Sequence, residues 1–304
     1  MSPEPSGFTM QPTVTEAVDA ARRDGWVLVA CDVSPPRGAA IDTLPEIARI
    51  PADFYCVAYA PGRAVRLDSL AMATVLRAAT GRGQIFNLAT RDMNTLALEN
   101  HLLGAEALGQ PNVAVVRGDD LTDRDKKTLK VVHNLTPTGL LEAISAMNDG
   151  RDLRGSTLRQ PSRLCAGATL DLARDHAAEV VLMAKKVRAG ARFLLTQPVY
   201  EPAAAEQFLA LYRSTNREEL DVPVFWGFPV LAPESITFGE PPARWRDELA
   251  AGRPGADLAA EEMRRFVESG ITTLYVMPPI LRGGVRDYTA AARAIADGLG
   301  RRIA

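Results

Sequence analysis

The chain has 304 residues, 47% of them hydrophobic and 24% charged, so it can bury a large core as one α/β barrel or as two ordinary domains. Its formal net charge of -2 provides no global positive field, which argues against a nucleic-acid partner. The three cysteines, Cys31, Cys56 and Cys165, lie far apart in apolar runs, so we expect neither a disulfide framework nor a metal cluster. This composition favours a reduced, cytoplasmic protein.

The first fourteen residues contain Pro, Ser and Gly with an acid, and no basic segment followed by an apolar block. We therefore expect no signal peptide, and we predict a flexible arm over residues 1–14. Further along, no apolar run reaches the ~18 residues that a membrane span requires, so no membrane association is expected.

From residue 15 to residue 304, short apolar runs rich in β-formers alternate with longer amphipathic stretches. The predicted strands are Trp26–Val33, Phe54–Tyr59, Gln84–Ala89, Asn112–Arg117, Arg163–Ala168, Arg192–Gln197, Val222–Phe228 and Thr272–Met277. The predicted helices between and after them are Ala39–Ile50, Ser69–Ala79, Met93–Leu108, Thr138–Met147, His176–Ala189, Pro202–Tyr212, Ala259–Glu268 and Tyr288–Leu299. Repeated strand-then-helix units of this number predict a single-domain (β/α)8 TIM barrel, of the α/β class, over residues 15–304.

Two connections are long, 119–136 after the fourth strand and 232–257 after the seventh. In a barrel, the segments that follow strands lie over the face that carries the active site. Both segments are therefore candidate lids, with solvated decoration as the alternative.

Polar residues at strand ends are the first candidates for chemistry in such a barrel. Asp32 ends the first strand shortly before two prolines, which indicates either a fixed acid or base or a turn-capping aspartate. Asn87 lies near the end of strand three and Asp119 follows strand four, where each can contact a ligand or cap a helix. Gln197 ends strand six and should have a partner, since an unpaired buried amide costs about 1–3 kcal/mol.

The sequence lacks the residues that several reaction classes require. The histidines His101, His133 and His176 are scattered, so neither a metal-ligand pair nor a Ser-His-Asp triad is evident. No P-loop occurs, and no G-x-G-x-x-G follows a strand, which disfavours phosphoryl transfer and a Rossmann site. Lys186 leaves an aldolase-type Schiff base as a minor alternative, although it lies on a helix before strand six.

Read in order from Val27 to Ala296, the strand ends resemble the methylenetetrahydrofolate reductase family, especially its branch found beside or fused to homocysteine methyltransferase modules. The segments that carry the resemblance are Asp32-Val33-Ser34-Pro35-Pro36-Arg37-Gly38, Thr90-Arg91-Asp92-Met93-Asn94, His101-Leu102-Leu103-Gly104-Ala105, Asn112-Val113-Ala114-Val115-Val116-Arg117-Gly118-Asp119, Lys185-Lys186-Val187-Arg188-Ala189-Gly190-Ala191 and Thr196-Gln197-Pro198-Val199-Tyr200.

This resemblance implies FAD at the mouth of the barrel, reduced by NADH or NADPH, and reduction of 5,10-methylenetetrahydrofolate to 5-methyltetrahydrofolate. By the same resemblance, Asp32 would supply a proton near the folate N10, and Asp119 and Gln197 would contact the pterin. The implied flavin-binding residues are Tyr59, Asn87, Arg117, Gly118, Glu179 and Lys186, the last as a cation near the ribose or phosphate. The family also commonly forms homo-oligomers.

The chain departs from the family pattern at three places. The family's acid is ordinarily glutamate, where Asp32 has a side chain shorter by one methylene. Histidine is frequent where Asn87 stands, and the run Gly227-Phe228-Pro229-Val230 differs from the usual glycine-x-leucine-proline. These differences leave alternatives open: a flavin-independent relative that takes hydride directly from nicotinamide, a homologue that works on another pterin-linked one-carbon unit, or a catalytically weak folate-binding homologue that acts with a methyltransferase.

Overall fold

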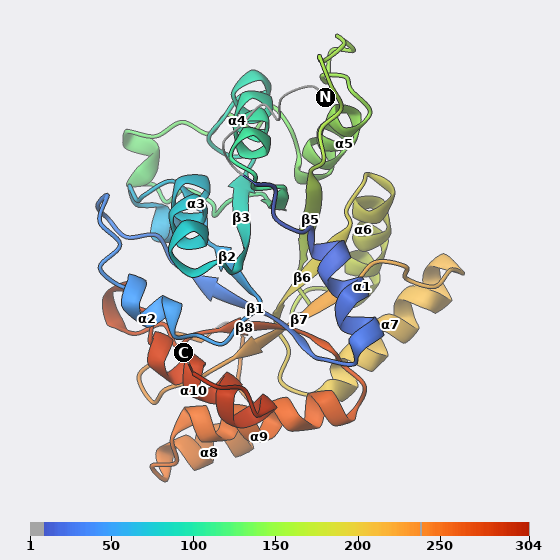
Figure 1. Cartoon of the computed structure of the whole chain (residues 1–304). Coiled ribbons are helices and arrows are strands. Elements are labelled where there is room, and N and C mark those ends of the chain that lie inside the picture. Colours follow the sequence, from blue (N-terminus) through green and yellow to red (C-terminus); the bar gives the residue numbers. More distant parts are fainter. Residues whose placement is uncertain (1–8, 238, 304) are drawn as a thin grey trace.

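All eight predicted strands form, and they pair in parallel order into a closed ring (Figure 1), which confirms the (β/α)8 barrel in this computed structural model of residues 9–237 and 239–303. Pairing of β1 with β8 closes the ring. The strands are β1 (Leu28–Val33), β2 (Phe54–Val57), β3 (Gly83–Ala89), β4 (Asn112–Val116), β5 (Cys165–Leu170), β6 (Phe193–Pro198), β7 (Val224–Pro229) and β8 (Thr273–Met277).

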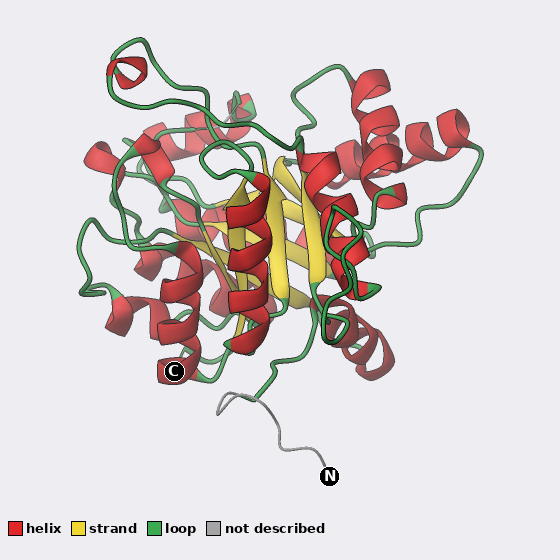
Figure 2. Ribbon diagram, turned by 90° about the horizontal axis from the view of Figure 1, so that it is seen from above, coloured by secondary structure: helices red, strands yellow, loops and turns green. Residues whose placement is uncertain are grey.

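Helices surround the strands on the outside of the ring (Figure 2). The predicted helices correspond to α2 (Leu44–Ala48), α3 (Ser69–Thr80), α4 (Thr95–Ala107), α5 (Pro137–Asn148), α6 (His176–Arg188), α7 (Pro202–Asn216), α9 (Gly255–Glu268) and α10 (Tyr288–Leu299). Two helices were not predicted, α1 (Val14–Asp24) and α8 (Ala243–Ala250), and short 3-10 turns form at η1 (Pro61–Arg63), η2 (Asp125–Lys127) and η3 (Arg282–Gly284). Within the described residues, no helix combines the length and apolar character needed to cross a bilayer.

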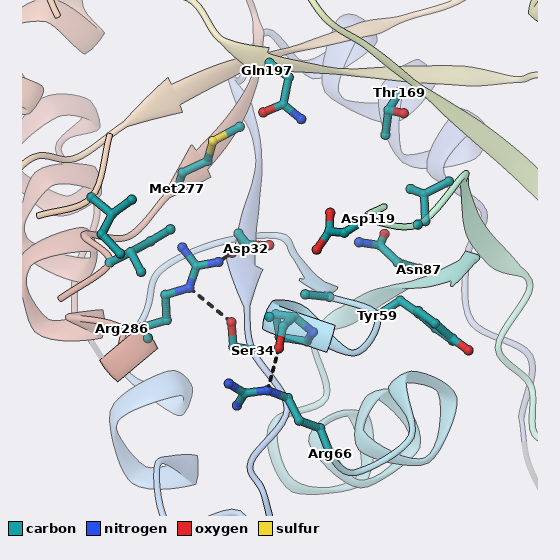
Figure 3. Close-up of a pocket in the computed structure, with 18 of the residues that line it drawn as sticks. Asp32, Ser34, Tyr59, Arg66, Asn87, Asp119, Thr169, Gln197, Met277 and Arg286 are labelled. Carbon is teal, nitrogen blue, oxygen red and sulfur yellow. Dashed lines mark hydrogen bonds and ion pairs between the residues drawn. The ribbon is translucent and has the colours of Figure 1, made fainter. Parts of the chain in front are cut away.

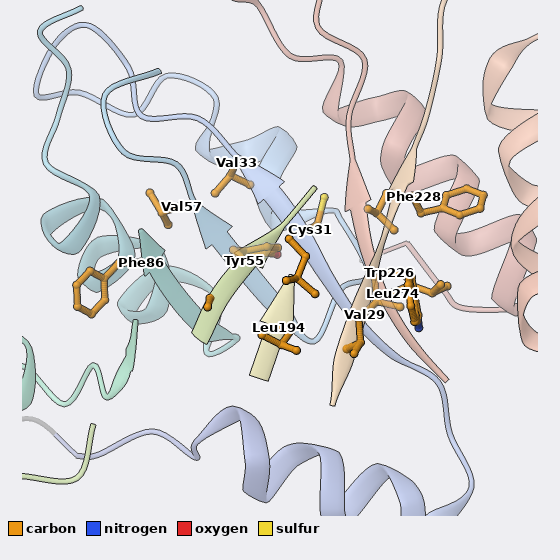
Figure 4. Close-up of a cluster of buried hydrophobic side chains, with 14 of the residues drawn as sticks. Val29, Cys31, Val33, Tyr55, Val57, Phe86, Leu194, Trp226, Phe228 and Leu274 are labelled. Carbon is orange, nitrogen blue, oxygen red and sulfur yellow. The ribbon is translucent and has the colours of Figure 1, made fainter. Parts of the chain in front are cut away.

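The alternation of side chains along each strand separates the core from the barrel interior. On β1, Val29 and Val33 belong to the large core between the strands and the outer helices (Figure 4). Leu28 and Ala30 belong instead to a second cluster inside the barrel. Asp32, two residues further along the same inward face, lines a cavity beyond that cluster. The period of two therefore directs this acid toward the barrel axis and away from the core.

Helix α1 closes the end of the barrel where the strands begin. Its buried residues Val14, Val18 and Ala21 pack with the interior cluster that includes Phe193. A capping box fixes the start of the helix, because Thr13 and Glu16 bond reciprocally. The opposite end of the barrel is left for polar side chains.

Part of the predicted amino-terminal arm is held against the barrel. The Gln11 side chain is buried, donates to the Gln84 carbonyl at 2.9 Å and accepts from its amide at 2.7 Å. The Gln11 backbone amide also donates to the Gly109 carbonyl at 3.2 Å, its side chain donates to the Gln110 side chain at 2.9 Å, and the capped helix α1 begins at Val14. Any arm must therefore end before residue 11. Residues 1–8 of the predicted range lie outside the described residues.

Val18→Ala should lower the free energy of unfolding by about 2 kcal/mol, because it removes two buried methyl groups and leaves a cavity under the barrel. Urea unfolding followed by circular dichroism measures the change. Val181→Ala on α6 is the matched control, since Val181 is 42% exposed and carries the same change in helix propensity. Equal effects of the two substitutions would show that α1 is not part of the core.

Candidate functional site

A cavity of about 650 Å³ opens at the carboxyl ends of the strands (Figure 3). This volume lies within the range of about 300–1,000 Å³ that small-molecule sites occupy. The predicted site residues that line it are Asp32, Tyr59, Asn87, Arg117, Gly118, Asp119 and Gln197. The structure thus brings seven of the nine predicted residues to one place.

Strand geometry explains this convergence. Asn87 and Gln197 occupy inward positions near the ends of β3 and β6, and Thr169 does so on β5. Asp119 reaches the cavity because the chain turns at Gly118, whose φ of +87° is rare for other residues. A Cβ atom at Gly118 would also lie 3.1 Å from the Cβ of Arg91, so this turn favours glycine twice over.

Asp32 is held by two donors from the other end of the chain. The Tyr275 hydroxyl donates to Oδ1 at 2.9 Å, and the Arg286 guanidinium contacts Oδ2 at 2.7 Å. Arg286 also donates through Nε to the Ser34 hydroxyl at 3.0 Å. Asp32 is only 5% exposed, so this ion pair is largely removed from water. The carboxyl group therefore has a fixed position at the cavity wall.

Tyr275 remains a hydroxyl donor in this arrangement. Burial raises the pKa of Tyr275 well above its usual value, and the neighbouring Asp32 carboxylate raises it further. Sequence reasoning missed both Tyr275 and Arg286. The available signal was a tyrosine on the inward face of strand eight, followed twelve residues later by Asp287 at the cap of α10, with Arg286 immediately before that cap.

Asp119 and Gln197 supply polar groups to the same space. Figure 3 shows both side chains directed into the cavity near Asp32. Within the described residues, neither side chain makes a hydrogen bond to another part of the protein. A carboxylate that only accepts and an amide that both donates and accepts are suited to the edge of a nitrogen heterocycle.

The wall from β2 to β4 carries the other predicted residues that line the cavity. Burial and then the nearby Asp92 carboxylate raise the pKa of Tyr59, so its hydroxyl stays neutral. The amide oxygen of Asn87 accepts from the Cys56 thiol at 3.5 Å, which leaves the amide nitrogen for a ligand. At the rim, Arg117 is exposed and pairs with Asp120 at 2.9 Å.

Glu179 and Lys186 do not line the cavity. They lie on the face of α6 that packs against the barrel, where both are buried. Lys186 Nζ donates to the Thr169 carbonyl at 2.5 Å, and the Glu179 carboxylate accepts from the Asp171 amide at 3.1 Å. Burial lowers the pKa of Lys186. Both side chains therefore brace the end of β5, and the predicted cation near a cofactor phosphate is not at the cavity surface.

Solved structures share this fold at low sequence identity. An uncharacterized protein from Clostridium thermocellum, described as binding two copies of 5-methyl-5,6,7,8-tetrahydrofolic acid, matches with a TM-score of 0.62 and 14% identity over 91% of this chain and 97% of its own. A 2,3-dimethylmalate lyase of the PEP mutase/isocitrate lyase superfamily matches with a TM-score of 0.51 and 12% identity, over 88% of this chain and 80% of its own. No curated protein matches the chain in sequence.

The family model for methylenetetrahydrofolate reductase matches residues 18–239, which is well over half of the chain. This match covers the strands that carry Asp32, Asn87 and Gln197, and the turn that carries Asp119. The resemblance of the strand ends is thus confirmed over the part of the barrel that forms most of the cavity. The chain belongs to the methylenetetrahydrofolate reductase family.

Proposed function

We propose that the protein reduces 5,10-methylenetetrahydrofolate to 5-methyltetrahydrofolate, with NADH or NADPH as hydride donor and FAD as cofactor. The observation that carries this proposal is that Asp32, Asp119 and Gln197 line one cavity of suitable size in a chain of this family. The folate bound by the Clostridium thermocellum protein gives additional support for a folate ligand.

Asp119 and Gln197 would orient the pterin ring. The Asp119 carboxylate would accept hydrogen bonds from ring N–H and amino groups, and the Gln197 amide would pair with a neighbouring donor and acceptor. Hydrogen bonds to an ionised carboxylate are stronger than those between neutral groups. Because these two groups approach from β4 and β6, they would fix the ring against the side of the cavity near Asp32.

Asp32 would supply the proton. The reaction adds a hydride to the methylene carbon, breaks its bond to N10 and places a proton on N10, so an acid is needed beside that nitrogen. Asp32 rests as the carboxylate partner of Arg286 and Tyr275, and each oxygen keeps a second lone pair on which it would take up the proton that it passes to N10. The two contacts would hold the shorter aspartate side chain in a single orientation toward the substrate.

The wall from β2 to β4 fits the ring part of a flavin. Tyr59, Asn87 and Gly118 would contact it, and Arg117 is the cation at the rim on that side. FAD, when bound, would pass the hydride from the nicotinamide to the one-carbon bridge. Lys186 does not line this wall, since its ammonium group donates to the Thr169 carbonyl.

A second candidate has specific support. The bond of Lys186 to β5, which places this cation outside the cavity lining, favours a homologue that works without flavin, or one that binds folate with little catalysis and serves a methyltransferase. Such a protein would use the same pterin contacts at Asp119 and Gln197.

Purified protein should oxidise NADH or NADPH with methylenetetrahydrofolate, form 5-methyltetrahydrofolate, and depend on FAD for turnover. The test measures product with and without added FAD, alongside the absorbance spectrum, and reactions without folate give the background. Turnover without any bound flavin would replace the proposal with direct hydride transfer. Folate binding without turnover would favour the partner protein, and the absence of both would reject a folate function.

A further inference from the structure

The charges that line the cavity are unevenly distributed. Asp32 is already paired with Arg286, and Arg117 with Asp120. Arg37, on the β1–α2 loop, and Arg66, on the β2–α3 loop, also line the cavity. Neither forms an ion pair with a carboxylate in the part of the chain that the structure describes. This end of the cavity therefore carries two positive charges that the protein does not neutralise.

Arg66 is fixed with part of its guanidinium unused. Nε donates to the Pro61 carbonyl at 3.0 Å and Nη1 to the Pro35 carbonyl at 2.8 Å. Nη2 makes no hydrogen bond within the described residues. Burial lowers the pKa of Arg66, and the like charge of Arg37 lowers it further. Fixed donors next to a second positive charge that no carboxylate neutralises are suited to bind an anion.

The loops around Arg66 contain strained backbone positions. Ala60 and Arg63, on the same loop, have φ values of 37° and 56°, which residues other than glycine rarely adopt. Such strain persists where the surroundings impose it, often beside a binding site. Across from this loop, Gly284 has a φ of 80°, and a Cβ atom there would lie 3.8 Å from Arg66 Nη2. Gly284 therefore lies beside Nη2, within van der Waals reach of a Cβ atom.

We propose that Arg37 and Arg66 form an anion subsite, which binds a carboxylate or phosphate group of a ligand whose ring lies against Asp119 and Gln197. The identity of that ligand rests on the proposed function. Carboxylates would come from the glutamate tail of the folate, and phosphates from the nicotinamide dinucleotide. A planar guanidinium can bind either group through paired hydrogen bonds.

Isothermal titration with two probes tests the subsite and separates the two sources. The probes are p-aminobenzoyl-triglutamate, which has the folate tail without the pterin, and ADP-ribose, which has the diphosphate without nicotinamide. Arg66→Gln should weaken binding of the matching probe about tenfold, and the exposed Arg37→Gln about threefold, since a charge-assisted bond is lost in each. Arg66→Lys should retain part of the affinity.

Arg282→Gln is the matched control, because Arg282 is exposed on η3 and does not line the cavity. The subsite proposal is wrong if Arg66→Gln and Arg37→Gln weaken binding of both probes no more than Arg282→Gln does. It is also wrong if the wild-type protein binds neither probe. Because Arg37 is exposed, its variant tests the charge without disturbing the loop. Fragment binding requires no turnover. If the protein is inactive but binds a probe through these arginines, only the proposed reduction is rejected. If it is active but its probe binding does not depend on the arginines, only the subsite is rejected.

Discussion

Asp32→Asn should lower the rate of methylenetetrahydrofolate reduction by about 100- to 10,000-fold, the usual contribution of a positioned general acid. The amide has nearly the same shape as the carboxyl group but has no acidic proton for N10. Because the proposed pterin contacts come from Asp119 and Gln197, which line the same cavity, the Michaelis constant for folate should change little. Initial rates of NADH or NADPH oxidation at saturating folate measure the effect.

Asp120→Asn is the matched control for this change. Asp120 lies next to the cavity-lining Asp119, its side chain is 78% exposed, and its pairing with Arg117 is at the rim, so activity should remain near that of the wild type. Asp32→Glu restores an acid and should be more active than Asp32→Asn. If the asparagine variant kept more than about a third of the activity, Asp32 would not be the proton source, because even the weakest general acids contribute more.

The barrel and much of the cavity were predictable because two simple periods determine them. Alternating strand and helix patterns gave the ring of eight strands, and the period of two within each strand placed Asp32 and Gln197 on the inward face. Parallel strands in a barrel end on the same side, so polar residues at their ends converge without any knowledge of loop structure.

The side-chain contacts of the site residues were harder to predict from the sequence. Asp32 takes its partners from β8 and the loop that follows, and no local pattern indicates which of the many arginines will pair with it. Lys186 was assigned to the cofactor's ribose or phosphate from the family resemblance, but helical phase turns its side chain toward β5, outside the cavity lining. Helix α1 was missed because its apolar residues Val14, Val18 and Ala21 cover the barrel end, outside the strand-helix repeat.

Arg286→Leu should lower the free energy of unfolding by about 3–5 kcal/mol, because it leaves a buried carboxylate without its cation. Asp32 is only 5% exposed, and Tyr275 would remain as its one donor from another residue. The Ser34 hydroxyl would lose its contact with Arg286 as well. Urea unfolding at pH 7 gives the change, with an unchanged slope showing that the unfolded state is the same.

The double variant Asp32→Asn with Arg286→Leu separates the ion pair from the packing of the arginine. Removing the charge of Asp32 should recover much of the stability lost in Arg286→Leu, since a neutral amide needs no counter-ion and costs less to bury. The coupling energy from the double-mutant cycle measures that recovery. Arg282→Leu on the same loop serves as control and should cost little, because Arg282 is exposed. Additive losses in the cycle would mean that Asp32 does not depend on Arg286, and that loop packing alone explains the single variant.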